Sequence, residues 1–197
     1  MADATPPTAR SAAGSGGARA AAFDEVFCGL LPRLYRRAVM LAGSRQSAED
    51  AVHEAYLKLA ARPQRFLAHP EPYAYAFTAV LSATRDAYRK ERRQVLVDEV
   101  ADVADGAGAG GGAGPGSGEW DGGVARRHAE LEAVRLLGRL SHRQAGIVIL
   151  VDLDGYTLDQ AAQIMKVHRG TAARHRARAL DRLRAYLVES EHGRAGR

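Results

Sequence analysis

The residues with the clearest chemistry are cations near the end of the chain. Between Lys166 and Arg184 stand seven Lys or Arg residues and one acid, Asp181. A helix that exposes charge only for solubility mixes both signs, whereas a helix that faces a phosphate backbone omits the acids. This excess indicates nucleic-acid binding, with an ordinary solvated helix face as the alternative. The cations are Lys166, Arg169, Arg174, Arg176, Arg178, Arg182 and Arg184.

The elements that position these cations have the order of a helix-turn-helix. Thr157 and Gln160 have the spacing of a capping box and predict the start of a short helix. After a break of three residues, a basic helix starts near His168. The second helix of such a motif places its first turns in the major groove of DNA. The residues expected to contact DNA are Arg169, Thr171, Arg174, His175 and Arg178.

Other kinds of site lack their signatures. Cys28 is the only cysteine, so an internal disulfide or a multi-cysteine zinc site is excluded, and we expect a small buried thiol. His53 stands three residues after Asp50, but one pair of ligands does not make a metal site. No nucleophile elbow or phosphate-binding loop is present. The sequence therefore predicts no enzyme, no metal and no cofactor.

The composition predicts two all-α domains. Residues 106–118 contain only Gly, Ala, Pro and Ser, which is typical of a flexible linker. The formal net charge is only +5, so the local clusters carry the argument. With no apolar run long enough for a membrane span and no signal pattern, we expect a cytoplasmic protein. The expected divisions are a disordered extension (1–22), a helical domain (23–97), an acidic and Gly-rich linker (98–123) and a second helical domain with the helix-turn-helix (124–190).

Helix-breaking and helix-capping residues divide the first domain into helices. Pro32 is expected to break or kink the first helix, and Gly43 to close it. Ser47, with Asp50 at N3, is expected to cap the second helix, and Pro63 to mark its end. A third helix opens at Pro70-Glu-Pro72 and finishes in cations. These cations are Arg85, Arg89, Lys90, Arg92 and Arg93.

The same kinds of residue mark the helix boundaries of the second domain. Leu131, Val134, Leu137 and Leu140 form a helical stripe. Ser141 is then expected to cap an apolar helix that runs to Leu153, and Gly155 to end it.

The predicted second helix has two different faces. Val52, Tyr56 and Leu59 form an apolar stripe that must face the core. The opposite face carries acids around one leucine, which suits a protein-docking surface, although single exposed leucines are common. The residues of this face are Asp50, His53, Glu54 and Leu57.

Several segments resemble one bacterial family in the same order. Ser47-Ala-Glu-Asp-Ala-Val-His-Glu-Ala-Tyr-Leu-Lys-Leu59 resembles the Asp-Ala-Glu-Asp-Leu-Val-Gln-Glu-x-Phe-Leu-x-Leu segment of extracytoplasmic-function (ECF) sigma factors. The segments 34–41 and 85–93 are similar to the preceding helix and to the end of the promoter-melting helix of that family. Segments 140–144, 153–162 and 170–171 resemble its fourth region. The resemblance covers about residues 23–93 and 130–187.

This resemblance implies a dissociable specificity subunit of core RNA polymerase that binds promoter DNA. The face with Asp50, His53, Glu54 and Leu57 would dock on the polymerase clamp helices. The cationic end of the third helix would bind and open the −10 element, and the helix from His168 would read the −35 element. Two alternatives stay open, a sigma-like regulator that does not support initiation and an adaptor for an acidic protein. An anti-sigma factor is a possible further partner.

A module that melts DNA needs aromatic rings beside cations, because stacking replaces base pairing on the separated strand. Four rings precede or accompany the cations of the third helix, and we expect Phe77 to pack in the core instead. The rings are Tyr73, Tyr75, Phe77 and Tyr88.

Five positions depart from the family pattern. Lys166 replaces a turn Gly and His168 a capping Ser, and each change is expected to cost about 1 kcal/mol. Arg176 replaces an apolar residue, Tyr75 a Trp, and Ser82 an Asn implicated in capturing a flipped base. These departures predict weakened or redirected promoter recognition.

Overall fold

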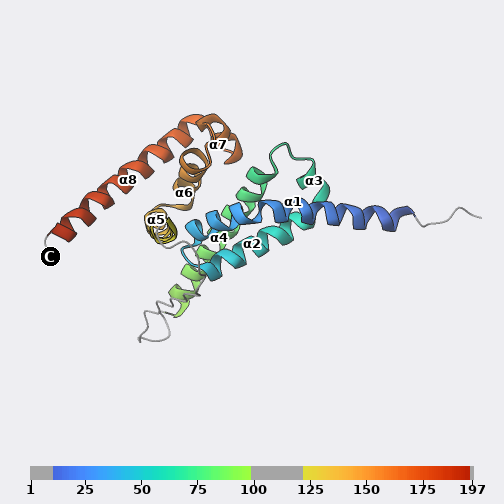
Figure 1. Cartoon of the computed structure of the whole chain (residues 1–197), viewed down its shortest axis with the longest axis horizontal. Helices are drawn as coiled ribbons and strands as arrows, with labels where there is room; N and C mark the ends of the chain where they lie inside the picture. Colours follow the sequence, from blue (N-terminus) through green and yellow to red (C-terminus); the bar gives the residue numbers. More distant parts are fainter. Residues whose placement is uncertain (1–10, 99–121, 196–197) are drawn as a thin grey trace, which may run out of the picture.

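The protein is described here by a computed structural model that covers residues 11–98 and 122–195. All regular elements in these two ranges are helices, which confirms the predicted all-α class (Figure 1). They are α1 (Ser11–Ala42), α2 (Arg45–Ala60), α3 (Pro63–Leu67), α4 (Pro72–Asp98), α5 (Gly122–Leu137), α6 (His142–Val148), the π-helix η1 (Ile149–Leu153), α7 (Leu158–Ile164) and α8 (Arg169–Ala195).

The first helix is longer than the sequence predicts. Residues 11–22 belong to α1, so the expected disorder of residues 1–22 is wrong for this part, and residues 1–10 lie outside the described ranges. Alanine has the highest helix propensity, and a long helix behind this segment removes the cost of nucleation. Pro32 lies inside α1 without ending it, and Gly43, at φ +76°, follows its last residue as predicted.

The start of α2 differs from the prediction by one turn. The side chain of Ser44, not Ser47, caps the helix, because Ser44 Oγ accepts a hydrogen bond of 3.1 Å from the backbone N–H of Ser47. Both serines stand three residues before a polar residue, so spacing alone favoured neither. Pro63 opens the short α3 that follows α2.

The N-terminal half (11–98) is held together by aromatic rings from three helices. Phe23 and Phe27 of α1 contact Phe66 of α3 and Tyr56 of α2, with ring centroids 5.1–6.3 Å apart. Helices α1, α2 and α4 lie against one another around this cluster. Cys28, predicted to be buried, is exposed, since its neighbour Phe27 takes the core side of α1.

In the C-terminal half (122–195), α6 and α7 each begin with a capping box. Ser141 pairs with Gln144 and Thr157 with Gln160, as predicted. The apolar helix that starts at His142 changes to a π-helix over its last five residues, and Gly155, at φ +78°, follows the turn. In the stripe before it, Leu137 and Leu140 are buried, but Leu131 is 61% exposed.

The two halves pack against each other. Their buried side chains form one continuous cluster, and α1 and α4 contact α5, α6 and α7. The sequence predicted separate domains on a tether and gave no sign of this contact. The predicted linker and Trp120 fall in residues 99–121, outside the described ranges.

None of the described helices is long and apolar enough to cross a bilayer. Within the same ranges, no three His, Cys, Asp or Glu side chains gather as ligands for a metal ion.

Candidate nucleic-acid interface

The turn between α7 and α8 accommodates two of the unusual residues. Lys166 adopts φ +52°, the left-handed conformation in which glycine is favoured, so the backbone keeps the expected turn. His168 Nδ1 accepts a hydrogen bond of 3.1 Å from the N–H of Gly170, at the first turn of α8. The imidazole thus replaces the missing serine cap, and the cost expected from its loss does not apply in full.

The outer face of α8 presents unpaired cations. Arg174 and Arg178 are exposed, and no acidic side chain of the described ranges forms an ion pair with either. Thr171 and His175 are half-buried beside them. Arg169 is exposed and forms a salt bridge of 2.8 Å with Asp159 of α7. The predicted DNA-contacting residues therefore share the start of one helix, and Arg174 and Arg178 are the most available.

Arg176 faces the opposite way. Its guanidinium binds both carboxylate oxygens of Asp152 in η1, with Nε 3.1 Å from Oδ2. This hydrogen bonding raises the pKa of Arg176. The arginine that replaces an apolar family residue thus fixes α8 to η1 by an ion pair, which is why the departure does not leave a cation in the core.

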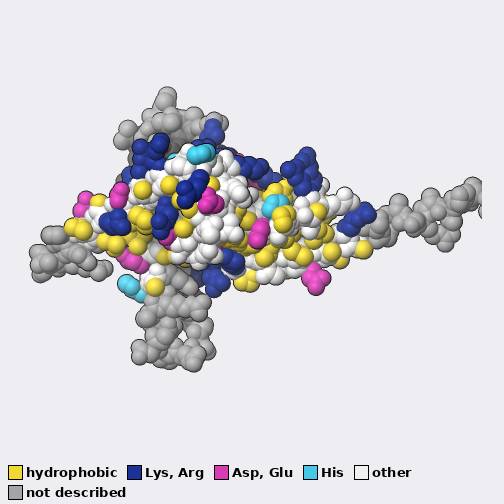
Figure 2. Space-filling view, turned by 90° about the horizontal axis from the view of Figure 1, so that it is seen from above, with side chains coloured by type: hydrophobic (Ala, Val, Ile, Leu, Met, Phe, Trp, Pro, Cys, Tyr) yellow, Lys and Arg dark blue, Asp and Glu magenta, His cyan; other side chains and the backbone are white. Residues whose placement is uncertain are grey.

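A second cationic segment lies at the end of α4. Arg85, Arg89 and Lys90 are exposed, and Arg85 lies 3.3 Å from Asp86 and 3.4 Å from the Ser82 hydroxyl. Arg92 and Arg93 belong to the same helix, but their side chains fall outside the described ones. Figure 2 shows that Lys and Arg cover more of the visible face than Asp and Glu.

The aromatic residues of α4 divide into two groups. Tyr73 and Phe77 are buried, so Phe77 belongs to the core as expected and neither ring can stack on a base in this arrangement. Tyr75 is half-buried and stacks on His69, with ring centroids 4.9 Å apart. Tyr88 is 49% exposed and lies 5.4 Å from the His142 ring.

The acidic face of α2 points to solvent. Val52, Ala55 and Leu59 are buried, whereas Leu57 and Glu54 on the other side are exposed. Glu54 forms a salt bridge of 2.7 Å with Lys58, one turn later. Asp50 and His53 are exposed on the same face as Leu57.

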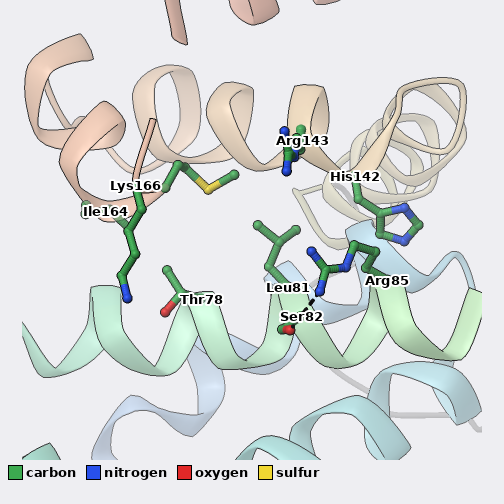
Figure 3. Close-up of a pocket in the computed structure, with 9 residues that line it drawn as sticks. Thr78, Leu81, Ser82, Arg85, His142, Arg143, Ile164 and Lys166 are labelled. Atoms are coloured by element: carbon green, nitrogen blue, oxygen red, sulfur yellow. Dashed lines mark hydrogen bonds between the residues drawn. The ribbon is translucent and has the colours of Figure 1, made fainter. Parts of the chain in front are cut away.

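A cleft of about 290 Å³ lies where the halves meet, between α4 and the segments around α6 and the end of α7 (Figure 3). Thr78, Ser82 and Arg85 of α4 form one wall, and Arg143 and Lys166 of the C-terminal half form the other. None of its described lining residues is acidic. Burial and the nearby Arg85 charge lower the pKa of His142 at its edge.

Asp154 lies in the contact between the two halves, and it was not identified from the sequence. It precedes Gly155, so by its type it indicates only a turn. Its side chain is 1% exposed and binds Arg33, Arg37 and Tyr73 of the other half. A partner more than 80 residues away leaves no local pattern, and no signal in the sequence pointed to it.

The chain is similar to known proteins in sequence and in fold. The model of Sigma-70 region 2 matches residues 28–94, and that of Sigma-70, region 4 matches residues 136–185. The ECF RNA polymerase sigma factor EcfG of Rhodopseudomonas palustris (strain TIE-1) is 31% identical over 158 residues, which cover 80% of each chain. The sigma factor RpoE of Bartonella quintana, solved in complex with the anti-sigma factor NepR, has a TM-score of 0.62 and 25% identity. That likeness covers 84% of this chain and 96% of the other.

The fold and its two cationic segments therefore define a sigma factor with regions 2 and 4. The chain belongs to the ECF sigma factor family. It directs RNA polymerase to promoters and acts in the initiation of transcription.

Proposed function

We propose that three surfaces on different helices divide the work of this sigma factor. The face of α2 with Asp50, His53, Glu54 and Leu57 docks on core RNA polymerase. The end of α4 binds and opens the −10 element, and the start of α8 reads the −35 element. The proposed DNA-contacting residues are Arg85, Arg89, Lys90, Arg92, Arg93, Arg169, Thr171, Arg174, His175 and Arg178.

One observation carries this division. Exposed cations occur at the end of α4 and at the start of α8, and these helices lie in the segments that match regions 2 and 4. A duplex reader requires a rigid helix that offers its first turns to the groove, and α8 offers Arg174 and Arg178. The α2 face, by contrast, combines acids with a leucine that is 54% exposed, which suits a protein surface better than DNA.

We also propose that the chain binds and positions but catalyses no reaction itself. The polymerase would form the phosphodiester bonds. The proposed units are residues 23–97 for docking and the −10 element and residues 124–190 for the −35 element, joined by residues 98–123. Helix α1 adds residues 11–22 to the first unit.

Run-off transcription with purified core polymerase tests the whole proposal. The complete chain should co-elute with core polymerase and support a transcript from a promoter of its own genome. If it co-elutes with polymerase and binds promoter DNA but no transcript forms, it acts as a regulator and not as an initiation factor.

The partner of the solved relative suggests a further interaction. That relative is bound to an anti-sigma factor, and we extend this class of partner to the present chain. A co-expressed small protein that co-purifies with the chain and suppresses run-off transcription would support this extension, whereas co-purification without suppression would argue against it.

A further inference from the structure

The contact between the halves centres on one buried carboxylate. Asp154 belongs to the C-terminal half, yet the side chains that donate to it all come from the N-terminal half. Arg33 Nε and Arg37 Nη2 lie 3.3 and 2.9 Å from Oδ1, and the Tyr73 hydroxyl lies 2.6 Å from Oδ2. With 1% of its side chain exposed, Asp154 has exchanged water for these donors.

The donors are themselves organised around the carboxylate. Arg37 is 17% exposed and donates a further bond of 3.2 Å to the Leu153 carbonyl, next to Asp154. The Arg33 guanidinium lies 3.8 Å from the centre of the Tyr73 ring. Burial and the hydrogen bond to Asp154 raise the pKa of Tyr73, so it stays a donor. A buried carboxylate is tolerated only with such partners, and separating the halves would remove all of them at once.

The other polar interactions across the contact are weaker than those at Asp154. Tyr156 reaches Glu71 at 3.4 Å, between two side chains near the surface. In the cleft, the lining contains Arg85, Arg143 and Lys166 and, among the described residues, no acid, so it carries positive charge (Figure 3). Apolar side chains of both halves also bury one another at this contact, but its polar attraction is concentrated at Asp154.

The closed arrangement covers the side of α4 that faces the cleft. Leu81 is 8% exposed, and its Cδ2 would lie 2.9 Å from a Cβ added to Gly146 of α6. Met165 packs at the same place, 3.2 Å from that position. Thr78 and Ser82 line the adjoining cleft (Figure 3). A DNA strand cannot lie along this side of α4 until the C-terminal half moves away.

We infer that Asp154 is an intramolecular latch: bound to Arg33, Arg37 and Tyr73, it holds the free chain closed and withholds the cleft side of α4 from single-stranded DNA. The inference rests on the proposed role of α4. The apparent dissociation constant for a ligand of the open form equals the intrinsic constant divided by the open fraction. Opening the latch therefore lowers the apparent dissociation constant for single-stranded DNA, at most by a factor of one divided by the open fraction.

A distance within the free chain tests the latch without DNA or polymerase. Cys28 is exposed on α1, and Glu189→Cys adds a second exposed thiol on α8, so two dyes or spin labels report the separation of the halves. Asp154→Ala should lengthen and broaden this distance. Arg37→Gln, which removes the donor from the other side, should do the same, and circular dichroism checks that both variants stay helical.

Asp152→Ala is the matched control. It removes the same charge two residues earlier, but Asp152 binds Arg176 within the C-terminal half. Its label distance should equal that of the parent. If Asp154→Ala keeps the parent distance, or if Asp152→Ala lengthens it equally, the latch does not exist.

Binding then tests whether closure withholds α4. The probe is a fluorescent single-stranded oligodeoxynucleotide pool of about 20 random bases, since unspecific strand binding uses stacking and phosphate contacts. Asp154→Ala should bind at least about tenfold more tightly than Asp152→Ala, and adding Arg85→Ala should remove the gain. If Asp154→Ala lengthens the label distance but binds the oligonucleotide no more tightly than Asp152→Ala, closure of the chain does not inhibit DNA binding. If the wild-type chain supports no transcription, the proposed function is wrong, but the label distances still test the latch.

Discussion

At the scale of single residues, His168 shows how an uncommon side chain can take over a structural task. Helix N-caps favour Ser, Thr, Asp and Asn because their short oxygens reach the free N–H groups of the first turn. In α8 the imidazole Nδ1 of His168 reaches the N–H of Gly170 instead. The departure from the family pattern could be found from the sequence, but its compensation depends on a side-chain rotamer that spacing does not reveal.

Lys166 keeps a strain that glycine would relieve. Its φ of +52° costs a residue with a Cβ on the order of 1 kcal/mol, and its side chain is exposed. We predict that Lys166→Gly raises the free energy of unfolding by about 1 kcal/mol in urea titrations. Lys166→Ala removes the same charge but keeps the strain, so its stability should not rise. Equal stability of the two variants would show that this turn is unstrained.

Arg174 and Arg178 separate two kinds of DNA contact. Arg174 lies nearer the start of α8, so we predict that it reads a base edge, and that Arg174→Ala costs about 1 to 3 kcal/mol on the best site and flattens discrimination at one position. Arg178→Ala should weaken all sites alike and lower the salt slope by about one unit, as expected for a phosphate contact.

Binding of both arginine variants to a library of upstream elements at two salt concentrations measures these effects. Arg182→Ala is a suitable control, because this exposed arginine lies one turn farther from the helix start. If neither variant differs from wild type in affinity or specificity, α8 does not enter the groove.

At the scale of elements, helix α2 combines a buried and an exposed face whose residues could be read from periodicity. The stripe Val52, Ala55 and Leu59 is buried, and Leu57 is 54% exposed on the other side. We predict that Leu57→Arg leaves α2 folded and abolishes co-elution with core polymerase, because a docking surface loses its apolar anchor and gains an unpaired cation.

Leu131→Arg is the matched control for docking. Leu131 is a similarly exposed leucine, but it lies on α5, away from the acidic face. It should co-elute like the wild type. Retained co-elution of a folded Leu57→Arg protein would remove the α2 face from the docking surface.

Element ends show where sequence reasoning succeeds and where it fails. The capping boxes at Ser141 and Thr157 were predicted correctly, because each pairs two residues at a fixed spacing. The start of α2 was wrong, because Ser44 and Ser47 offer competing caps. The change from α6 to the π-helix η1 had no signal in the sequence, since an apolar run fits both forms.

At the scale of the whole molecule, the sequence could give the order of the parts but not their contact. Local periodicity identifies each helix, whereas Asp154 meets Arg33 and Arg37 across more than 110 residues. A polar residue at a turn is ordinarily solvated, so burial of Asp154 follows only from the packing of the two halves. For the same reason, Tyr73 was expected beside DNA and is found bound to this carboxylate.

The cations of α4 give the last prediction, which concerns the opening of the promoter. Arg85, Arg89 and Lys90 are exposed together on the end of one helix. If they hold the separated strand, their joint replacement by Ala removes stabilisation of the melted state but leaves the duplex contacts of α8 intact. We predict that the triple variant, assembled with core polymerase, loses more of the wild-type level of open complexes on duplex promoters than on templates that are already melted around the −10 element.

Permanganate footprinting or fluorescence of a base in the −10 element measures this opening on the duplex promoter, and the amount of polymerase–promoter complex is measured on the template that is already melted. The pre-melted template supplies the internal control, because it omits the cost of separating the strands. A joint Ala replacement of Arg174 and Arg178 on α8 should instead reduce complex formation on both templates, since upstream binding precedes opening. If complex formation by the α4 variant falls equally on both templates, these three cations bind the promoter without acting in its melting.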